Sequence, residues 1–385
     1  MSAADNSRIV SMHSATLAQT APLKIAFSYN NSWRHVTQQY LADTLAPGCA
    51  THFDLDLYRA NISILRLLEI AQSRGESPDV IAHLVNAPGL PRDFQVSPVR
   101  TISLDIDSFW WTESRIRWSM LFDYVFVWHL ALVPKYQAAG HPKVFPMPHA
   151  VDADLCVGAQ PEDDRPFDLG WIGAFHYGHY ARRNRIIGGL SARFKMNDFQ
   201  KQHSKQQTAD VYRHSKMVVN VSRDDFPPEA NMRCYEAMGA GALLIAQIPT
   251  ELTDWGFREG EHFVGWREEK EIPELVQHYL DQPAKRNQIA RAGQELTLRD
   301  FTFQRCRDKM DTVLRENPGE FFAPARKWSS DQVSMVYLDY YYRCNVLDAA
   351  LAEFVSMRKA NPKAYWNGIG MVLKTLRHSV KQALM

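Results

Sequence analysis

The sequence predicts an α/β protein made of two successive units of alternating strands and helices, followed by a helical extension. Short apolar runs alternate with helix-like segments over residues 24–148, which favours a parallel sheet with crossover helices. This periodicity stops over residues 151–166 and restarts from residue 167. At 385 residues the chain is also long for one core, because roughly 100–200 residues per domain predicts two or three domains.

The first unit opens with an apolar run at residues 24–29 (KIAFSY), which fits a buried strand. The Asn-Asn-Ser turn that follows offers good N-caps for a helix over residues 33–45. The other expected elements of this unit are a helix over 62–75 and strands over 53–58, 78–85, 99–107, 124–130 and 143–148.

The second unit follows an acidic, turn-rich stretch without period at residues 151–166, which we interpret as an interdomain linker. Strands are then expected over residues 167–173, 216–222 and 242–247, and the run GEHFVGW that follows is expected to form a turn. Helices are expected over residues 182–194, 204–215, 231–239, 271–282, 284–301 and 302–317. The tail from residue 329 is helical and suggests a helix hairpin, although one such unit is not a repeat array.

Five segments follow from this pattern: a flexible N-terminal arm (1–22), a first Rossmann-like domain (23–150), the linker (151–166), a second Rossmann-like domain (167–320) and a helical extension (321–385). Two such units face each other across a cleft, and in open parallel sheets ligands bind outside the carboxyl ends of the strands. The loops after the strands should therefore carry the function.

Composition excludes several classes of protein. The 44 basic and 43 acidic residues nearly cancel, which argues against a protein built to bind nucleic acid. The sequence has no apolar run long enough for a membrane helix, and its N-terminus lacks a secretory pattern. The five cysteines are widely spread without a CxxC, so we expect no disulfide framework, no metal site and a cytoplasmic location.

The familiar phosphate-binding and hydrolase motifs are absent, which argues against a nicotinamide enzyme or a nucleotide-hydrolysing switch. Instead, FDLGWIGAFHYGHYARRNRII places a strand, a glycine turn and a basic helix start in succession. Arg182 and Arg183, with the backbone N–H groups of that helix, would form a cradle for a diphosphate. A solvated basic helix face is the competing interpretation.

A second pattern is RCYEAMGAGALLIA, residues 233–246, where Arg233 and Glu236 share one helix face. A surface ion pair is the plain interpretation, and such a pair would contribute little to stability. The surroundings are apolar, however, and a carboxylate in such surroundings is costly without a partner. A sugar diol is one such partner, because a carboxylate accepts hydrogen bonds from two vicinal hydroxyls.

This helix and strand, with the runs GEHFVGW and PELVQHYL that follow, resemble the C-terminal half of GT-B glycosyltransferases. The resemblance is closest to the spore-maturation-type branch with a glycosyl-transferase group 1 domain, and it covers residues 24–314. It implies two Rossmann-like domains facing a cleft and a nucleotide-diphosphate sugar as donor, with no further cofactor. Protein charge, rather than a bound metal, would support the leaving diphosphate.

The resemblance also assigns residues to the donor. Glu236 would bind the ribose hydroxyls, Arg233 would lie near the phosphates or the sugar, and Gly173 with its loop would approach the diphosphate. The donor side would be completed by the other polar residues around it, namely Arg182, Arg183, Asn231 and His176. As a metal site, the His176–His179 pair is a weak signal.

One departure concerns stereochemistry. Many retaining group 1 enzymes carry two glutamates with seven residues between them, but here Pro228 stands eight positions before Glu236. Glu229 is out of step by one residue, so the first glutamate of the pair is absent or displaced. Retaining and inverting outcomes therefore both stay open.

An inverting enzyme needs a general base near the acceptor hydroxyl. Asp107, Asp105 before it and His35 lie on loops of the first unit and are the candidates. Asp107 precedes the aromatic run Phe109-Trp110-Trp111, which would stack on a sugar or peptide acceptor. The competing interpretation is that Asp107 caps a helix, that the tryptophans fill the core and that His35 is a solvated helix residue.

We therefore expect a glycosyltransferase acting on a glycan, lipid-linked or protein acceptor, with partner docking through the C-terminal helices as a further possibility. Arg182, Arg183 or Arg233 would stabilise the leaving diphosphate, and domain closure would exclude water. Two alternatives remain. One is a nucleotide-sugar epimerase or hydrolase with the same fold, and the other is a non-catalytic binding or adaptor protein that kept the fold.

Overall fold

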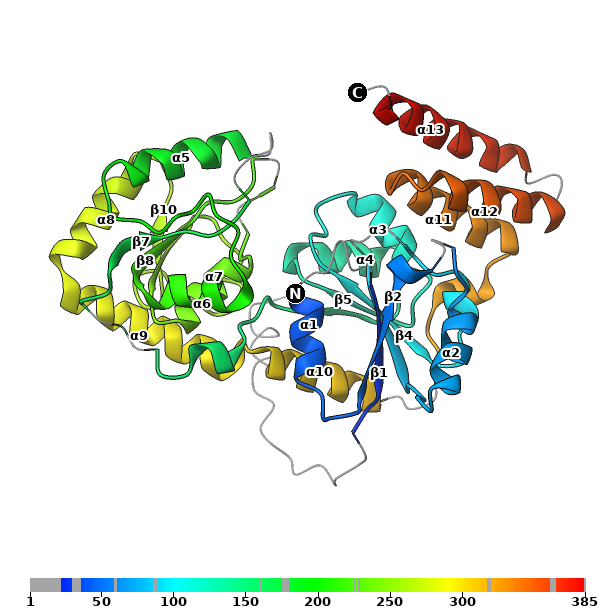
Figure 1. The fold of residues 1–385 in the computed structure, drawn as a ribbon, viewed down its shortest axis with the longest axis horizontal. Coiled ribbons are helices and arrows are strands. Elements are labelled where there is room, and N and C mark those ends of the chain that lie inside the picture. The colour runs from blue at the N-terminus through cyan, green and yellow to red at the C-terminus, as the bar shows by residue number, and fades with distance from the viewer. Residues whose placement is uncertain are drawn as a thin grey trace.

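The computed structural model consists of two α/β units side by side, with a stack of helices on the first (Figure 1). It describes the residues 22–29, 36–58, 61–85, 89–159, 161, 163–174, 180–224, 226–227, 229–316, 320–360 and 365–383. The N-terminal arm to residue 21 and the two histidines His35 and His176 lie outside the described residues.

The N-terminal unit holds a six-stranded sheet in the order β2-β1-β3-β4-β5-β6, with every neighbouring pair parallel. Its strands are β1 (Ile25–Tyr29), β2 (Ala50–Asp54), β3 (Val80–Leu84), β4 (Arg100–Asp105), β5 (Tyr124–Val127) and β6 (Val144–Pro146). Its helices are α1 (Val36–Asp43), α2 (Ile64–Ser73), α3 (Thr112–Ser119) and α4 (Val133–Ala138). The predicted alternation of strands and helices is therefore present.

The C-terminal unit holds a four-stranded parallel sheet in the order β10-β9-β8-β7. Its strands are β7 (Phe167–Gly170), β8 (Ser215–Asn220), β9 (Leu243–Gln247) and β10 (Val264–Trp266). Its helices are α5 (Ala181–Ser191), α6 (Lys205–Arg213), α7 (Met232–Gly239), α8 (Glu271–Asp281) and α9 (Pro283–Asp300). The strand order of the first sheet reverses at β1, whereas the second sheet runs in sequence order, and in open parallel sheets of this kind ligands bind outside the carboxyl ends of the strands.

The strand expected over residues 53–58 lies three residues earlier, because its second half is a short 3-10 turn. The Asp54 side chain accepts a hydrogen bond from the backbone N–H of Asp56 at 3.1 Å, which stabilises the turn. Alternating residues alone do not separate a strand from a capped turn of this length.

The helix α10 (Phe303–Glu316) returns to the N-terminal unit, although its sequence lies within the stretch expected for the second unit. Its buried residues Phe303 and Met310 pack in one core with Ile25 and Phe27 of the first sheet. Tyr40 of α1 stacks on Phe303, with ring centroids 4.6 Å apart. The chain thus crosses between the units twice.

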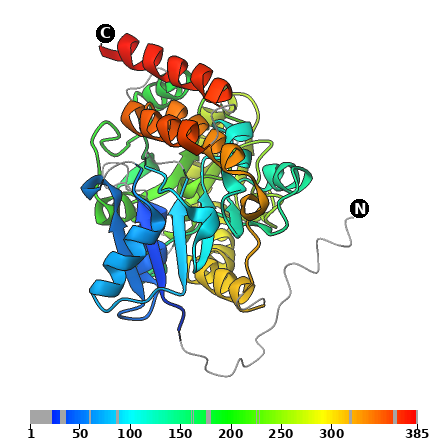
Figure 2. The same cartoon turned by 90° about the vertical axis from the view of Figure 1, so that its right-hand side faces the viewer.

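The helical extension consists of α11 (Ser330–Arg343), α12 (Leu347–Ala360) and α13 (Tyr365–Ala383), which pack on the first unit with α13 against both α11 and α12 (Figures 1 and 2). The helix α11 is part of the N-terminal core, because Tyr337 and Tyr340 are fully buried against residues such as Trp118. The expected helical extension is therefore confirmed. Over the described residues, no helix is both long and apolar enough to cross a bilayer.

Candidate functional site

The first feature of the site is a pocket of about 330 Å³ beside the start of α7. Asn231 is the N-cap of this helix, which then carries Arg233 and Glu236 one turn apart. All three line the pocket, so the predicted pair faces one cavity. The remaining lining residues come from both units and are Tyr40, Ile172, His203, Lys205, Thr208, Tyr212 and Met232.

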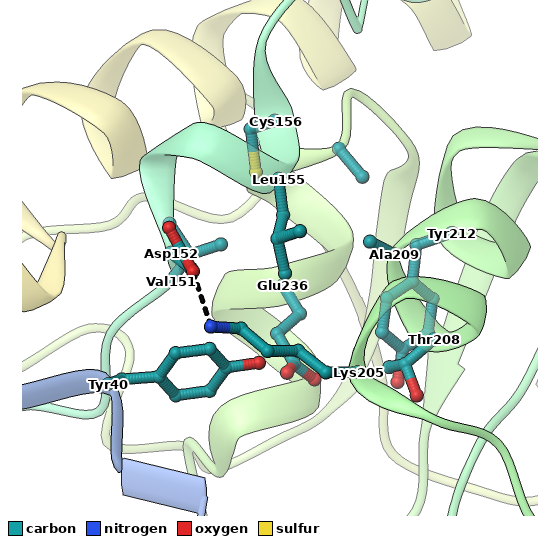
Figure 3. A pocket seen from close by; sticks show the side chains of 11 residues that line it. Tyr40, Val151, Asp152, Leu155, Cys156, Lys205, Thr208, Ala209, Tyr212 and Glu236 are labelled. Carbon is teal, nitrogen blue, oxygen red and sulfur yellow. Dashed lines mark ion pairs between the residues drawn. The ribbon is translucent and has the colours of Figure 1, made fainter. Parts of the chain in front are cut away.

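Glu236 is half-buried, and its carboxylate points toward Tyr40 and Lys205 (Figure 3). Among the residues that the structure describes, none donates a hydrogen bond to that carboxylate. Lys205 instead pairs with Asp152, with the Lys205 Nζ 2.8 Å from a carboxylate oxygen. Burial raises the pKa of Glu236 to about 7, although the positive charge of Arg233 acts to lower it. The cost of burying this carboxylate is offset only in part by Arg233. A ligand whose hydroxyl groups donate hydrogen bonds to the carboxylate would offset more of that cost.

Arg233 is buried and held at the ends of two strands of the C-terminal sheet. Its Nε donates to the Ile172 carbonyl at 2.7 Å, and its Nη1 donates to the Asn220 side-chain oxygen at 2.7 Å. The guanidinium also lies over the Trp171 ring, 5.1 Å from its centroid. These contacts fix the orientation of the positive charge before any ligand arrives.

Gly173 lies directly against this guanidinium. A Cβ at this position would come within 2.6 Å of the Arg233 Nη2 and 2.8 Å of the Trp171 ring. A glycine is required here because the backbone and the arginine approach so closely. The structure therefore brings Gly173 and Arg233 together, as the predicted donor site requires.

Arg183 and Arg182 point in different directions at the start of α5. Arg183 is buried between Tyr180 and Trp171, with its guanidinium 3.8 Å from the Tyr180 centroid, and donates to the Ala174 carbonyl. Burial and, after it, the positive charge of nearby Arg233 together lower the pKa of Arg183 to about 10. Arg183 and Arg233 are thus two neighbouring cations.

Arg182 instead forms a half-exposed ion pair, with its Nε 2.8 Å from Glu269. Its backbone N–H donates to the Asp224 carboxylate at 3.0 Å, so this donor at the helix start is already used. Of the predicted arginines, Arg183 and Arg233 therefore face the Gly173 loop, whereas Arg182 is engaged on the surface.

The N-terminal unit contributes His129, which follows β5 and was not among the predicted site residues. His129 is fully buried, with its Nδ1 3.3 Å from Glu251 and its Nε2 3.8 Å from Glu229, both of the C-terminal unit. Phe109 packs on the imidazole, with ring centroids 4.4 Å apart. Burial alone would lower the pKa of His129, but the hydrogen bond with Glu251 and the charge of Glu229 outweigh it and raise the pKa.

Glu229, which is displaced by one residue from the position of the first glutamate in retaining enzymes, thus lies at the boundary between the units. Burial raises the pKa of its carboxyl to about 7, with His129 acting against this shift and Asp107 reinforcing it. The Asn231 side-chain amide donates to Glu229 at 3.5 Å. The glutamate that the sequence left unplaced is therefore a buried acid facing the opposite unit.

Asp107 lies in the loop after β4, half-buried, with a positive φ of 56°. Its charge acts on His129 and on Glu229, which places it near both. Asp105, by contrast, is fully buried and receives a hydrogen bond from the Arg115 Nη1 at 2.6 Å. The Tyr136 hydroxyl also donates to Asp105. Asp105 is thus committed to holding its own unit together, whereas Asp107 faces the boundary.

The residues that sequence reasoning missed have a common signal. His129 follows β5 directly, and Glu251 follows β9, so both lie after the carboxyl ends of strands. Lys205 opens α6 and was read only as a helix residue. Which of these loops meet across the boundary depends on how the two units pack, and sequence spacing does not carry that information.

Comparison with known proteins finds a family model that matches the C-terminal unit. Residues 173–312 match the model of the family described as glycosyl transferase-like. No curated protein sequence gives a significant match. The matched stretch contains α5 to α9, and therefore Arg233 and Glu236.

The fold resembles that of solved glycosyltransferases. HepE of Anabaena, solved in complex with UDP, has a TM-score of 0.56 at 12% identity, covering 77% of this chain and 100% of that one. The sucrose-phosphate synthase of Thermosynechococcus elongatus has a TM-score of 0.53 at 12% identity, covering 76% and 98%. A glycosyltransferase from Rickettsia africae has a TM-score of 0.53 at 11% identity, covering 77% and 99%. The chain therefore has the GT-B fold.

Proposed function

We propose that this protein is a glycosyltransferase that moves a sugar from a nucleotide-diphosphate sugar to an acceptor hydroxyl at the boundary of its two units. One observation carries the proposal: the Glu236 carboxylate, which receives no hydrogen bond from the residues that the structure describes, lines the same pocket as the oriented guanidinium of Arg233. The carboxylate suits the vicinal hydroxyls of a ribose, and the guanidinium suits a diphosphate.

In this proposal the acceptor oxygen attacks the anomeric carbon of the donor sugar. The bond from that carbon to the diphosphate oxygen breaks, and the diphosphate leaves with the electron pair. Arg183 and Arg233, already oriented beside Gly173, stabilise the negative charge that develops on the leaving group. We propose that these side chains supply the required positive charge without a divalent metal.

The acceptor proton needs a base if the reaction inverts the anomeric centre. Asp107 and His129 both lie on the N-terminal side of the boundary and are the candidates. His129 has the arrangement of an oriented base, because Glu251 holds one ring nitrogen while the other faces Glu229. In a retaining reaction, Glu229 would instead face the donor sugar.

Nucleotide binding tests the proposal. Isothermal titration calorimetry with UDP, and then with ADP and GDP, should detect binding to at least one of them. UDP is the first choice because HepE was solved with UDP and with UDP-glucose. Binding that survives in full when Glu236 is replaced by alanine, or the absence of any binding, would contradict the proposal.

Turnover separates the transferase from its rivals. With the bound nucleotide sugar as substrate, release of the nucleoside diphosphate should depend on an added acceptor. Release that is unaffected by acceptors would indicate a hydrolase. Tight binding without any turnover would indicate a binding protein.

A further inference from the structure

Among the side chains that the structure describes on the last two helices, four large apolar ones are exposed. Leu351 and Val355 of α12 are 45% and 49% exposed, and Leu373 and Leu376 of α13 are 49% and 43% exposed. Within each helix the two residues are three or four positions apart, which aligns them in one stripe. We call these four residues the outer seam.

The stripe on α12 lies next to α13. Around α12, Glu353 faces α11, because its carboxylate accepts a hydrogen bond from Ser334. Phe354 faces α13, where it lies near Gly368. At about 100° per residue, Leu351 and Val355 follow roughly 60° and 100° beyond Phe354, on the side away from Glu353.

The stripe on α13 borders the same line of contact. Met371 lines a pocket with residues of α11 and α3, and Gly368 packs against Leu338 of α11 and against Phe354 and Met357 of α12. Leu376 and Leu373 follow about 80° and 140° beyond Gly368, on the side away from Met371. The two stripes therefore flank the α12–α13 contact on its outer side, and Figure 2 shows α13 as the outermost helix.

The charges around the outer seam are mostly positive. Arg358 and Lys359 are exposed at the end of α12, and Lys374 and Arg377 are exposed on α13. The sequence of α13 contains no aspartate or glutamate. On α12, Glu353 is buried beside Arg92, and the exposed Asp348 stands about two turns before Val355.

We propose that the outer seam binds the surface of an anionic phospholipid membrane. Exposed leucines and valine flanked by lysine and arginine are the pattern of helices that lie in a membrane interface, where apolar side chains enter the headgroup boundary and cations meet anionic lipids. A basic face without acids on α13 fits such a surface by charge. The binding is peripheral and reversible, because the seam presents only four apolar side chains.

The place of the outer seam also bears on the acceptor. The helix α11 packs on α3, which begins just after Asp107 and the aromatic run. The membrane-binding helices thus belong to the unit proposed to receive the acceptor, and the acceptor is a lipid-linked molecule held in the bilayer. This part rests on the proposed function, whereas membrane binding itself does not.

Cosedimentation of the full chain with lipid vesicles tests the proposal. The protein should bind vesicles of phosphatidylcholine containing one third phosphatidylglycerol, and bind vesicles of phosphatidylcholine alone at least about tenfold more weakly. Added salt should weaken the binding to anionic vesicles, because it screens the charges. Equal binding to both kinds of vesicle, or binding to neither, overturns the proposal.

Two variants and one control locate the surface. The doubly substituted L373S/L376S and K374E/R377E proteins should each lose at least about tenfold in vesicle affinity. The control is Leu65→Ser, because Leu65 is a 39% exposed leucine on α2 and does not belong to the outer seam. Binding that is unchanged in both variants, or capture of a protein partner through these residues without vesicle binding, overturns the proposal.

Nucleotide binding keeps this test separate from that of the proposed function. Both variants should bind the nucleoside diphosphate as the unaltered protein does, because Glu236 and Arg233 lie in the other unit. A protein that binds vesicles but no nucleotide refutes the transferase and leaves the membrane surface standing. A protein that binds nucleotide but no vesicles refutes the membrane surface and leaves the proposed transferase standing.

Discussion

The Arg233 guanidinium lies so close to the backbone of Gly173 that a Cβ there would come within 2.6 Å of its Nη2. The arginine has little room to withdraw, because the Ile172 carbonyl and the Asn220 side chain hold its other two nitrogens. Gly173→Ala should therefore displace the guanidinium and weaken binding of a nucleoside diphosphate by about tenfold or more, since hydrogen bonds to charged groups contribute about 1.5–3 kcal/mol each. Calorimetry measures this directly.

The matched control for this substitution is Gly188→Ala. A Cβ at Gly188, within α5, meets no atom within 4 Å. This variant should keep full nucleotide affinity and unfold at a slightly higher denaturant concentration, because alanine favours a helix by about 1 kcal/mol over glycine. Equal affinity in the two variants would mean that the Gly173–Arg233 approach has no part in binding.

Glu236→Gln should weaken nucleotide binding by about tenfold to a hundredfold. The amide keeps one acceptor oxygen but loses the charge that strengthens hydrogen bonds from ribose hydroxyls. A 2′-deoxynucleotide lacks one of those hydroxyls. The substitution should therefore weaken binding of the 2′-deoxynucleotide less than it weakens binding of the ribonucleotide. The control is Glu274→Gln, an exposed glutamate of α8. An equal loss of affinity for both nucleotides would show that Glu236 does not bind the ribose hydroxyls.

The pH dependence of donor binding follows from the same carboxyl. Burial raises the pKa of Glu236 to about 7, and the ionised form accepts stronger hydrogen bonds through both of its oxygens, whereas protonation turns one oxygen into a donor. Affinity for a nucleotide-diphosphate sugar should therefore rise from pH 6 to pH 8, and this rise should vanish in Glu236→Gln. A nucleotide sugar is the better probe, because a free terminal phosphate itself titrates near pH 6.

The stability of the ligand-free protein should change in the opposite direction. A carboxyl whose pKa is raised on folding binds its proton more tightly in the folded state, so stability falls as pH rises from the unfolded pKa near 4.5 to about 7. Glu229, whose pKa is also about 7, adds to this slope. Urea unfolding across this range should show a shallower slope in Glu236→Gln, and an unchanged slope would contradict the burial of the carboxyl.

Tyr340→Ala should destabilise the N-terminal unit by about 3–5 kcal/mol, because it empties a fully buried aromatic site. Tyr340 packs edge-on against Trp118 of α3, with ring centroids 4.8 Å apart. Urea unfolding measures the loss, and the neighbouring Tyr342→Ala, at a half-buried position, is the control. Similar free energies of unfolding in both variants would mean that α11 does not contribute to the core of the N-terminal unit.

Periodicity predicts the fold correctly, and helix spacing predicts that Arg233 and Glu236 face one cavity. The alternation of apolar strands and helices predicts both parallel sheets. The R-x-x-E spacing places Arg233 and Glu236 on one helix face, and both residues line one pocket. The contacts at the boundary between the two units could not be predicted from periodicity or spacing. The meeting of His129 with Glu229 and Glu251 joins residues 100 or more positions apart, and it depends on how two rigid units pack. The return of α10 to the first unit depends on the same packing.

Asp107 and His129 are the two candidates for the base, and single substitutions distinguish them. If the reaction inverts, loss of the true base should lower turnover by about a hundredfold or more and leave nucleotide affinity unchanged. Asp107→Asn and His129→Gln should therefore differ strongly, with only one of them losing turnover to this extent. The measurement is acceptor-dependent release of the nucleoside diphosphate, together with calorimetry on each variant.

Glu251→Gln adds the information on positioning. If His129 is the base, the amide should shift the pH profile of turnover to lower pH, because Glu251 helps to raise the pKa of His129. If Asp107 is the base, Glu251→Gln should leave the profile unchanged. Should Asp107→Asn and His129→Gln both keep turnover, neither group acts as a base. The reaction would then be a retaining one, in which Glu229, held at 3.8 Å from His129, faces the donor sugar.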